Sequence, residues 1–169
     1  YSIWRDTSGN RYTDPETGRP YPLPGAVQMI FSDLGTENAI ETRGFSAYVW
    51  IRDRLVAMGV PAEQIAFMQH YKKNSAKQRL FNDLNQGRKR FVLGSTATMG
   101  TGVNAQQRLK ALHHLDVPWL PSDIEQREGR IERQGNQNDE IELYGYATSG
   151  SMDATNWQML ERKARFINM

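Results

Sequence analysis

The 169-residue sequence contains no cysteine, and this absence excludes disulfide bonds and zinc sites built from thiolates. Its apolar runs fall short of the roughly 18 to 20 residues that a membrane-spanning helix requires, and no signal peptide is visible. We therefore expect no membrane partner. The 21 Lys and Arg residues exceed the 19 Asp and Glu residues by only two. The net charge is therefore too small to indicate a nucleic-acid partner. Evidence for such a partner would have to come from local clusters of basic residues.

The first residues differ in character from the rest of the chain. Residues 1–25 are interpreted as an N-terminal appendage or linker, and residues 26–169 as one domain. Residues 7–10 have the composition of a turn and are compatible with a hairpin between short stretches that hold Trp4 and Tyr12. Because the opening segment has no core pattern of its own, we expect the chain to be a fragment of a longer protein.

From residue 26 onward, short apolar runs alternate with amphipathic stretches. The apolar runs predict buried strands at 27–31, 64–68, 91–95, 111–115 and 140–147. Amphipathic spacing predicts helices at 45–58, 75–86 and about 122–133, and a last helix that holds Trp157 and Ile167. This alternation predicts an α/β fold, with a parallel sheet covered by helices on both faces. Ligands of such sheets bind at the carboxyl ends of the strands.

Arg127, Arg130 and Arg133 follow one another at intervals of three residues. On a helix this spacing turns each side chain by about 300°, so we expect a slanting ladder of guanidiniums near one face. Arginine is permanently charged and presents a planar fork of donors that suits phosphate oxygens. A ladder that faces a nucleotide would stabilise the charge developing on a leaving phosphate. The alternative is a solvated helix face on which Glu128 and Glu132 pair with the arginines.

A loop rich in glycine and hydroxyl residues follows the third predicted strand, from Ser95 to Asn104. Gly100 and Gly102 would let the backbone approach a ligand closely. Ser95 and Thr96 can donate hydrogen bonds to the phosphates of a nucleic acid, and Asn104 could bond a sugar hydroxyl. Taken alone, this composition is more often that of an ordinary turn.

The order of these motifs resembles the second RecA-like lobe of superfamily-two helicases. A strand ending in Phe31-Ser32-Asp33 comes first, followed by the Ser-Thr loop and by Asp116-Val117-Pro118-Trp119-Leu120-Pro121. The stretch from Gln126 to Gln137 and the strand around Tyr144 complete the order. The resemblance covers about residues 27–167, implies a RecA-like domain, and is closest to Swi/Snf-like translocases of double-stranded DNA. Residues 126–136 also look like large phage and mobile-element helicases that accompany a DNA methyltransferase.

The resemblance implies an ATP site shared by two lobes. In this family, paired arginines of the last motif reach the γ-phosphate of ATP bound to the first lobe, and Arg133 matches the arginine finger and Arg130 its companion. Gln126 matches the glutamine that places the phosphate or the attacking water. Gly102 and Asn104 match loop residues near the nucleotide ribose and the lobe interface. Arg127 has no fixed role in the Swi/Snf pattern but matches an arginine of the DEAD-box version of the motif, which implies a contact with the nucleotide. Ser95 and Thr96 match residues that contact the DNA backbone.

The chain has no Gly-Lys-Ser/Thr phosphate-binding loop and no acidic pair that would hold Mg²⁺ after a strand. The resemblance therefore assigns ATP and Mg²⁺ mainly to the N-terminal RecA-like lobe of the same protein. We expect the full-length protein to be an ATP-hydrolysing DNA helicase or translocase whose partners are that lobe and double-stranded DNA, and this fragment to be inactive. Two alternatives stay open: a non-catalytic helicase-like module that binds DNA or protein, and an RNA helicase lobe. We expect an intracellular location, cytoplasmic in a bacterial or phage-infected cell or nuclear in a eukaryotic one.

Further basic, histidine and tryptophan residues invite functional interpretation. Two clusters could contact DNA phosphates or simply form a solvated surface, namely Lys72, Lys73, Lys77 and Arg79, and Arg88-Lys89-Arg90. His113 and His114 are adjacent in a predicted strand and point to opposite faces, so we predict no metal site. Trp119 lies between two prolines, and we expect it to be a packing anchor at the base of the loop, with stacking on a nucleic acid as the alternative.

Overall fold

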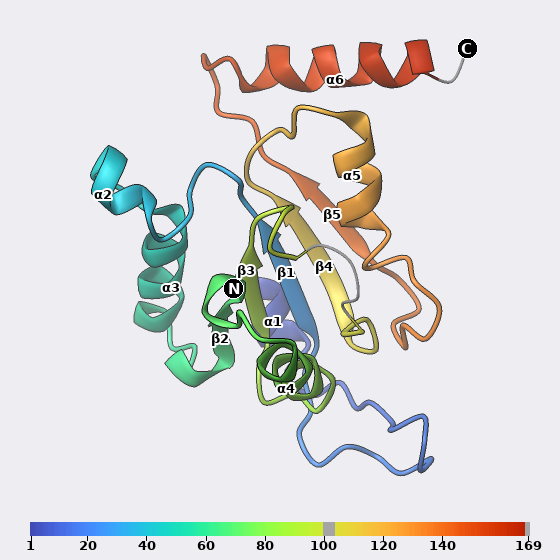
Figure 1. The fold of residues 1–169 in the computed structure, drawn as a ribbon. Coiled ribbons are helices and arrows are strands. Elements are labelled where there is room, and N and C mark those ends of the chain that lie inside the picture. The colour runs from blue at the N-terminus through green and yellow to red at the C-terminus, as the bar shows by residue number, and fades with distance from the viewer. Residues whose placement is uncertain (100–103, 168–169) are drawn as a thin grey trace.

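The computed structural model describes residues 1–99 and 104–167, which form a five-stranded sheet with helices around it (Figure 1). The strands are β1 (Val27–Phe31), β2 (Ile65–Phe67), β3 (Phe91–Gly94), β4 (Leu109–His114) and β5 (Glu142–Gly145). Every pairing is parallel, and the strand order is β2-β3-β1-β4-β5. The predicted α/β fold with a parallel sheet is confirmed.

The central position of β1 explains its sequence. All five residues of β1 are buried, because the strand has β3 on one side and β4 on the other and a layer of side chains on each face. An unbroken apolar run is typical of a parallel strand covered on both faces. β5 lies at the edge of the sheet, and its side chains are correspondingly more exposed.

Helices cover both faces of the sheet, as the alternation predicts. On one face, α4 (Asn74–Asn85) packs Leu80, Phe81 and Leu84 into a core cluster with alternate residues of β1. On the other face, α3 (Ala47–Ala57) contributes Tyr48 and Leu55 to a second cluster. The remaining helices are α1 (Ser2–Asp6), α2 (Ala39–Arg43), α5 (Pro121–Glu128) and α6 (Asp153–Ile167), with short 3₁₀ turns at Ala62–Gln64 and Met68–His70.

Local sequence explains where α3 begins and ends. Ser46 precedes its first turn, and the Ser46 hydroxyl accepts a hydrogen bond from the backbone N–H of Val49 at 3.3 Å. Serine is a favoured residue at this position because it satisfies a donor that has no partner within the helix. Gly59 follows the helix with a φ of 105°, a conformation that glycine adopts without strain.

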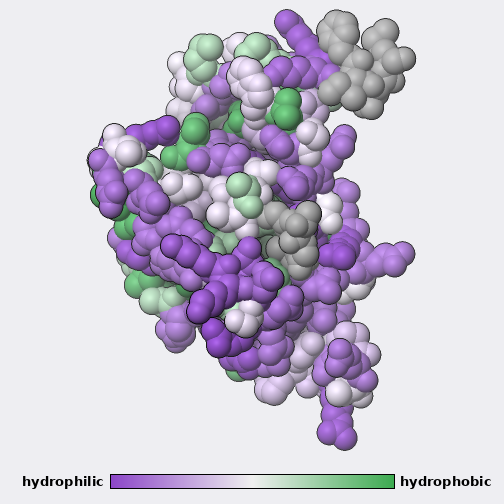
Figure 2. All heavy atoms as spheres, in the orientation of Figure 1, coloured by the Kyte–Doolittle hydropathy of each residue, from purple (hydrophilic) through white to green (hydrophobic). Residues whose placement is uncertain are grey.

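The carboxyl ends of the strands form the edge on which the functional candidates lie. Figure 1 shows the strand arrows pointing toward α6, which lies across this end of the molecule. Figure 2 shows that the face seen in this view is largely hydrophilic, with hydrophobic residues mainly near α6 and along the side of α2 and α3. No helix in the described part of the chain combines the length and the apolar character needed to span a membrane.

The helix α5 is shorter than predicted, and the arginine ladder does not form. The helix ends at Glu128, and the N–H of Ile131 then bonds the carbonyl of Glu128 at 2.9 Å in a tighter turn. Gly129 favours this ending because glycine is a poor helix former. The turn also buries Ile131 completely against the sheet. Arg130 and Arg133 therefore lie beyond the helix on which Arg127 is placed, and the prediction of a helix to residue 133 is wrong.

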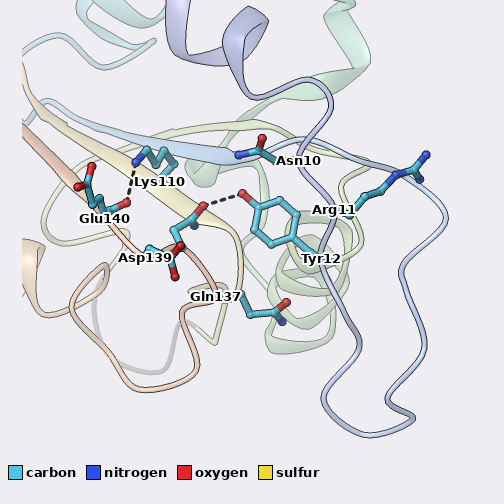
Figure 3. Close-up of a pocket in the computed structure, with 8 residues that line it drawn as sticks. Asn10, Arg11, Tyr12, Lys110, Gln137, Asp139 and Glu140 are labelled. Carbon is cyan, nitrogen blue, oxygen red and sulfur yellow. Dashed lines mark hydrogen bonds between the residues drawn. The ribbon is translucent and has the colours of Figure 1, made fainter.

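The N-terminal segment does not contain the hairpin expected around residues 7–10. Residues 2–6 form α1 instead, and a single antiparallel bridge joins Thr13 to Pro20. Tyr12 is buried, and its hydroxyl donates to Asn138 Oδ1 at 2.7 Å. Figure 3 shows this bond and the bond from Lys110 to the carbonyl of Glu140 at the rim of a polar hollow of about 470 Å³.

Two buried arginines anchor this N-terminal segment to the domain. Arg90 donates to the carbonyl of Trp4 at 2.8 Å and to the hydroxyl of Thr7 at 2.9 Å. Arg108 donates to the carbonyl of Leu23 at 2.8 Å, and its guanidinium lies over the ring of Tyr12 at 5.0 Å. Burial lowers the pKa of both guanidiniums to about 10. The assignment of Arg90 to a DNA-contacting cluster is wrong, because its donors are committed to residues 1–26.

Candidate functional site

A pocket of about 520 Å³ opens at the carboxyl edge of the sheet. Its walls come from the ends of β1 and β3 and from α5, and the lining residues are Asp33, Thr36, Ser95, Thr96, Ala97, Asp123 and Gln126. Parallel strands bring the residues that follow them to the same edge, which is where ligands of such sheets bind. The pocket brings together three of the predicted site residues, Ser95, Thr96 and Gln126.

Arg127 is the centre of a buried ionic network beside this pocket. Its Nη2 donates to Asp33 at 2.9 Å and to Asp116 at 3.3 Å, and its Nε donates to the Thr96 hydroxyl at 2.9 Å. The guanidinium carbon lies 5.1 Å from the centre of the Phe31 ring. One side chain therefore joins the loops that follow β1, β3 and β4. Such a planar cation with five donors suits two carboxylates at once.

Asp116 holds the loop after β1 in place through hydrogen bonds. Its Oδ2 accepts hydrogen bonds from the Ser32 hydroxyl at 2.9 Å and from the backbone N–H groups of Asp33 and Leu34 at 2.6 and 2.9 Å. A carboxylate bonded in this way is held in one orientation. Asp116 thereby sets the position of the backbone that carries Asp33.

His114 completes the network in its neutral form. Burial, followed by the positive charge of Arg127, lowers the pKa of His114 to about 4. Nδ1 of the neutral ring can accept from Arg127 Nη1 at 3.3 Å, while Nε2 donates to Glu128 Oε1 at 3.1 Å. Burial raises the pKa of Glu128. His113 points to the opposite face and lies against Gln28 and Tyr146, as the strand geometry predicts.

The two hydroxyls of the loop after β3 differ in their freedom to bind a ligand. The Thr96 hydroxyl donates to Asp33 Oδ2 at 3.0 Å and accepts from Arg127, so its single proton is already used. The Ser95 hydroxyl lies 3.0 Å from that of Thr98, which can also donate to the Ser95 carbonyl at 3.2 Å. The Ser95 proton can therefore turn toward a ligand without leaving Thr98 unpaired. Of the two predicted DNA contacts, the geometry favours Ser95.

Gln126, Arg130 and Arg133 lie at and just beyond the end of α5. Gln126 is exposed in the last turn of the helix, and Arg133 is exposed in the turns that follow. Arg130 is half-buried, and burial together with the nearby charge of Arg133 lowers its pKa.

Other predicted residues lie apart from the pocket. Asn104 precedes β4, and its carbonyl accepts a hydrogen bond from Asn85 at 2.8 Å near the amino ends of the strands. Lys72 and Lys73 are exposed immediately before α4. Gly102 lies outside the described residues, so its predicted role stays a prediction.

Three residues of the network, Asp33, Asp116 and His114, are absent from the predicted site. Each of them ends or follows a strand, and that position is the signal by which they could have been found. Trp119 is not a packing anchor, because it is 76% exposed and Lys163 Nζ covers its ring at 4.0 Å. In the described part of the chain, no group of three or more His, Asp and Glu side chains is arranged to hold a metal ion.

The strand order, the helices on both faces and the polar groups gathered at the carboxyl edge define a RecA-like lobe. The family model of the helicase conserved C-terminal domain matches residues 48–135, and the chain belongs to this family.

Two curated relatives match part of the chain. Defense against restriction protein B of Escherichia phage P1 is 30% identical over 91 residues, which are 54% of this chain and 4% of that protein. An uncharacterized ATP-dependent helicase of Bacillus subtilis, YqhH, is 34% identical over 87 residues, which are 52% of this chain and 15% of that protein. The chain thus spans only a small part of these relatives.

Solved structures of low sequence identity share the fold. The C-terminal part of the Fun30 ATPase domain has a TM-score of 0.61 at 16% identity, over 80% of this chain and 39% of that one. The DUF1998 helicase MrfA bound to DNA has a TM-score of 0.59 at 17% identity, over 85% and 18%. The C-terminal domain of S. cerevisiae Dbp5, bound to Gle1 and IP6, has a TM-score of 0.53 at 13% identity, over 85% and 70%.

Proposed function

We propose that this chain is the second motor lobe of an ATP-dependent DNA helicase or translocase, closest to the Swi/Snf-like class. The observation that carries the proposal is the pocket at the carboxyl edge, which Gln126 and Ser95 line, with Arg130 and Arg133 in the turns that follow α5. The family match and the description of YqhH as an ATP-dependent helicase support it.

In this proposal, Arg133 is the arginine finger and Arg130 its companion, and both act on ATP and Mg²⁺ held mainly by the absent first lobe. Gln126 would place the γ-phosphate or the attacking water from the neighbouring helix turn. Arg127 has its donors committed to carboxylates, so we assign it to holding the edge together rather than to the nucleotide.

The nucleic acid would lie along the same edge. Ser95 would donate to a DNA phosphate, and Lys72 and Lys73 would add charge to the path of the backbone. The helicase MrfA, which shares the fold and whose structure was solved with bound DNA, supports DNA as the partner. Gly102 keeps its proposed place near the nucleotide, whereas Asn104 does not, because it lies near the amino ends of the strands.

The test of the catalytic proposal is Arg133→Ala in the full-length protein. We expect ATP turnover to fall by about 10³-fold, because an arginine finger contributes about 10³ to 10⁵ to turnover. ATP affinity should change little, because the first lobe holds most of the nucleotide. Arg54→Ala on α3 is the matched control, since Arg54 is exposed on the other side of the sheet.

Unchanged turnover in Arg133→Ala would remove Arg133 from the finger role. A full-length wild type without ATPase activity would instead favour a non-catalytic module that binds DNA or protein. Measuring the stimulation of turnover by duplex DNA and by RNA at equal salt separates a DNA translocase from an RNA helicase.

A further inference from the structure

The carboxylate of Asp33 binds two groups of Thr96, a residue in the loop after β3. Its Oδ1 accepts the backbone N–H of Thr96 at 2.7 Å, and its Oδ2 accepts the Thr96 hydroxyl at 3.0 Å. The same Oδ2 accepts Arg127 Nη2 at 2.9 Å. Thr96 is therefore clamped between a carboxylate and a guanidinium, and both its backbone and its side chain are fixed.

Asp33 is itself held in place by hydrogen bonds, and its side chain also faces the pocket. Asp116 bonds the backbone N–H of Asp33, so the residue that holds Thr96 is itself held. The side chain of Asp33 is nevertheless 38% exposed and lines the pocket. Asp33 is thus placed to control how the loop presents Ser95, the neighbour of Thr96, to a ligand in the pocket.

We propose that Asp33 is a positioning residue for nucleic-acid binding, which acts through Thr96 to aim the Ser95 hydroxyl at a backbone phosphate. This inference rests on the proposed function, because it concerns the nucleic-acid side of the same edge. It assigns a favourable role to a carboxylate in a place where a carboxylate alone would repel phosphate.

The sign of one substitution distinguishes positioning from simple electrostatics. Asp33→Asn removes a negative charge near the proposed phosphate path, so charge alone predicts tighter DNA binding. Loss of positioning predicts weaker binding, because the amide has a single acceptor oxygen and cannot accept the Thr96 backbone N–H in addition to the Thr96 hydroxyl and the Arg127 guanidinium. The fold should tolerate the change, since Asp116 still pairs with Arg127.

The experiment measures the dissociation constant for a fluorescent DNA duplex by anisotropy, with the full-length protein at fixed salt. We expect Asp33→Asn to raise the dissociation constant at least about fivefold. This change in binding free energy is about the net contribution of one hydrogen bond. Asp123→Asn is the matched control, because Asp123 lines the same pocket and carries the same charge. That control should leave binding unchanged or tighten it.

A double variant tests whether Asp33 acts through Thr96. We expect the double variant Asp33→Asn with Thr96→Val to lose less DNA affinity than the sum of the two single losses, because both changes weaken the contact between Asp33 and the Thr96 hydroxyl. Additive losses, or an Asp33→Asn variant that binds as tightly as the wild type or more tightly, would overturn the inference. DNA-stimulated ATPase of the wild type would then still support the proposed motor. A wild type that neither binds DNA nor responds to it would overturn both.

Discussion

Replacing Arg127 by methionine should destabilise the domain strongly. Methionine keeps much of the side-chain volume but leaves Asp33 and Asp116 without their cation, and Thr96 without a donor. Removing one partner of a buried ion pair costs about 3 to 5 kcal/mol. The side chain of Asp116 is 15% exposed, whereas that of Asp33 is 38% exposed, so water can solvate the carboxylate of Asp33. We therefore expect a loss at the low end, about 3 kcal/mol.

Urea unfolding of the chain, followed by circular dichroism and tryptophan fluorescence, measures this loss. For a domain of this size, about 3 kcal/mol corresponds to a fall in melting temperature of roughly 6 to 12 °C. Arg54→Met is the control, because Arg54 is exposed on α3. Converting Asp33 and Asp116 to asparagine in the Arg127→Met background should recover part of the loss, since no carboxylate is then left unpaired. A loss below about 1 kcal/mol for Arg127→Met would refute this reasoning.

Further predictions concern the histidine, the N-terminal anchor and a helix cap. Because the pKa of His114 is about 4 in the fold and about 6.5 in the unfolded chain, stability should fall as pH drops from about 6.5 to 4, by up to about 3 kcal/mol. Urea titrations across that range should show a shallower slope for His114→Asn, and an identical slope would contradict the assignment. Arg108→Met should release the N-terminal segment and speed tryptic cleavage at Arg19 about tenfold, whereas equal cleavage would show that other contacts suffice. Ser46→Ala should cost about 1 kcal/mol through loss of the α3 cap, measured by thermal unfolding against Ser8→Ala, which changes an exposed serine.

The sequence predicts the strands well because a buried strand of a parallel sheet consists of a short run of apolar residues. The run at β1 is apolar throughout, and β1 forms where it is predicted. The end of α5 is not predictable in the same way. Arg130 and Ile131 continue a helical spacing beyond Gly129. Glycine alone does not fix the end of a helix, and the burial of Ile131 against the sheet is seen only in the structure. Periodicity therefore locates an element better than it locates its end.

The site is predicted less completely than the fold. Ser95 and Thr96 line the pocket because they follow the carboxyl end of β3, and Gln126 joins them from α5. The burial of Arg90 and Arg108 has no local signal, since the partners that hold them lie 23 to 86 residues away in the chain. A basic residue in a sequence suggests the surface, and only tertiary contacts reveal that it is an internal anchor.

The network around Arg127 also has a consequence for how such sequences can change over time. The positive charge at position 127 compensates the negative charges at positions 33 and 116, although positions 33 and 127 are 94 residues apart in the chain. A substitution that removes the cation leaves two carboxylates in need of compensation, so the three positions should vary together in related sequences. Domains that lack a basic residue at the position of Arg127 should also lack one of the two acids. A correlation of this kind would mark a distinct lineage among otherwise similar domains.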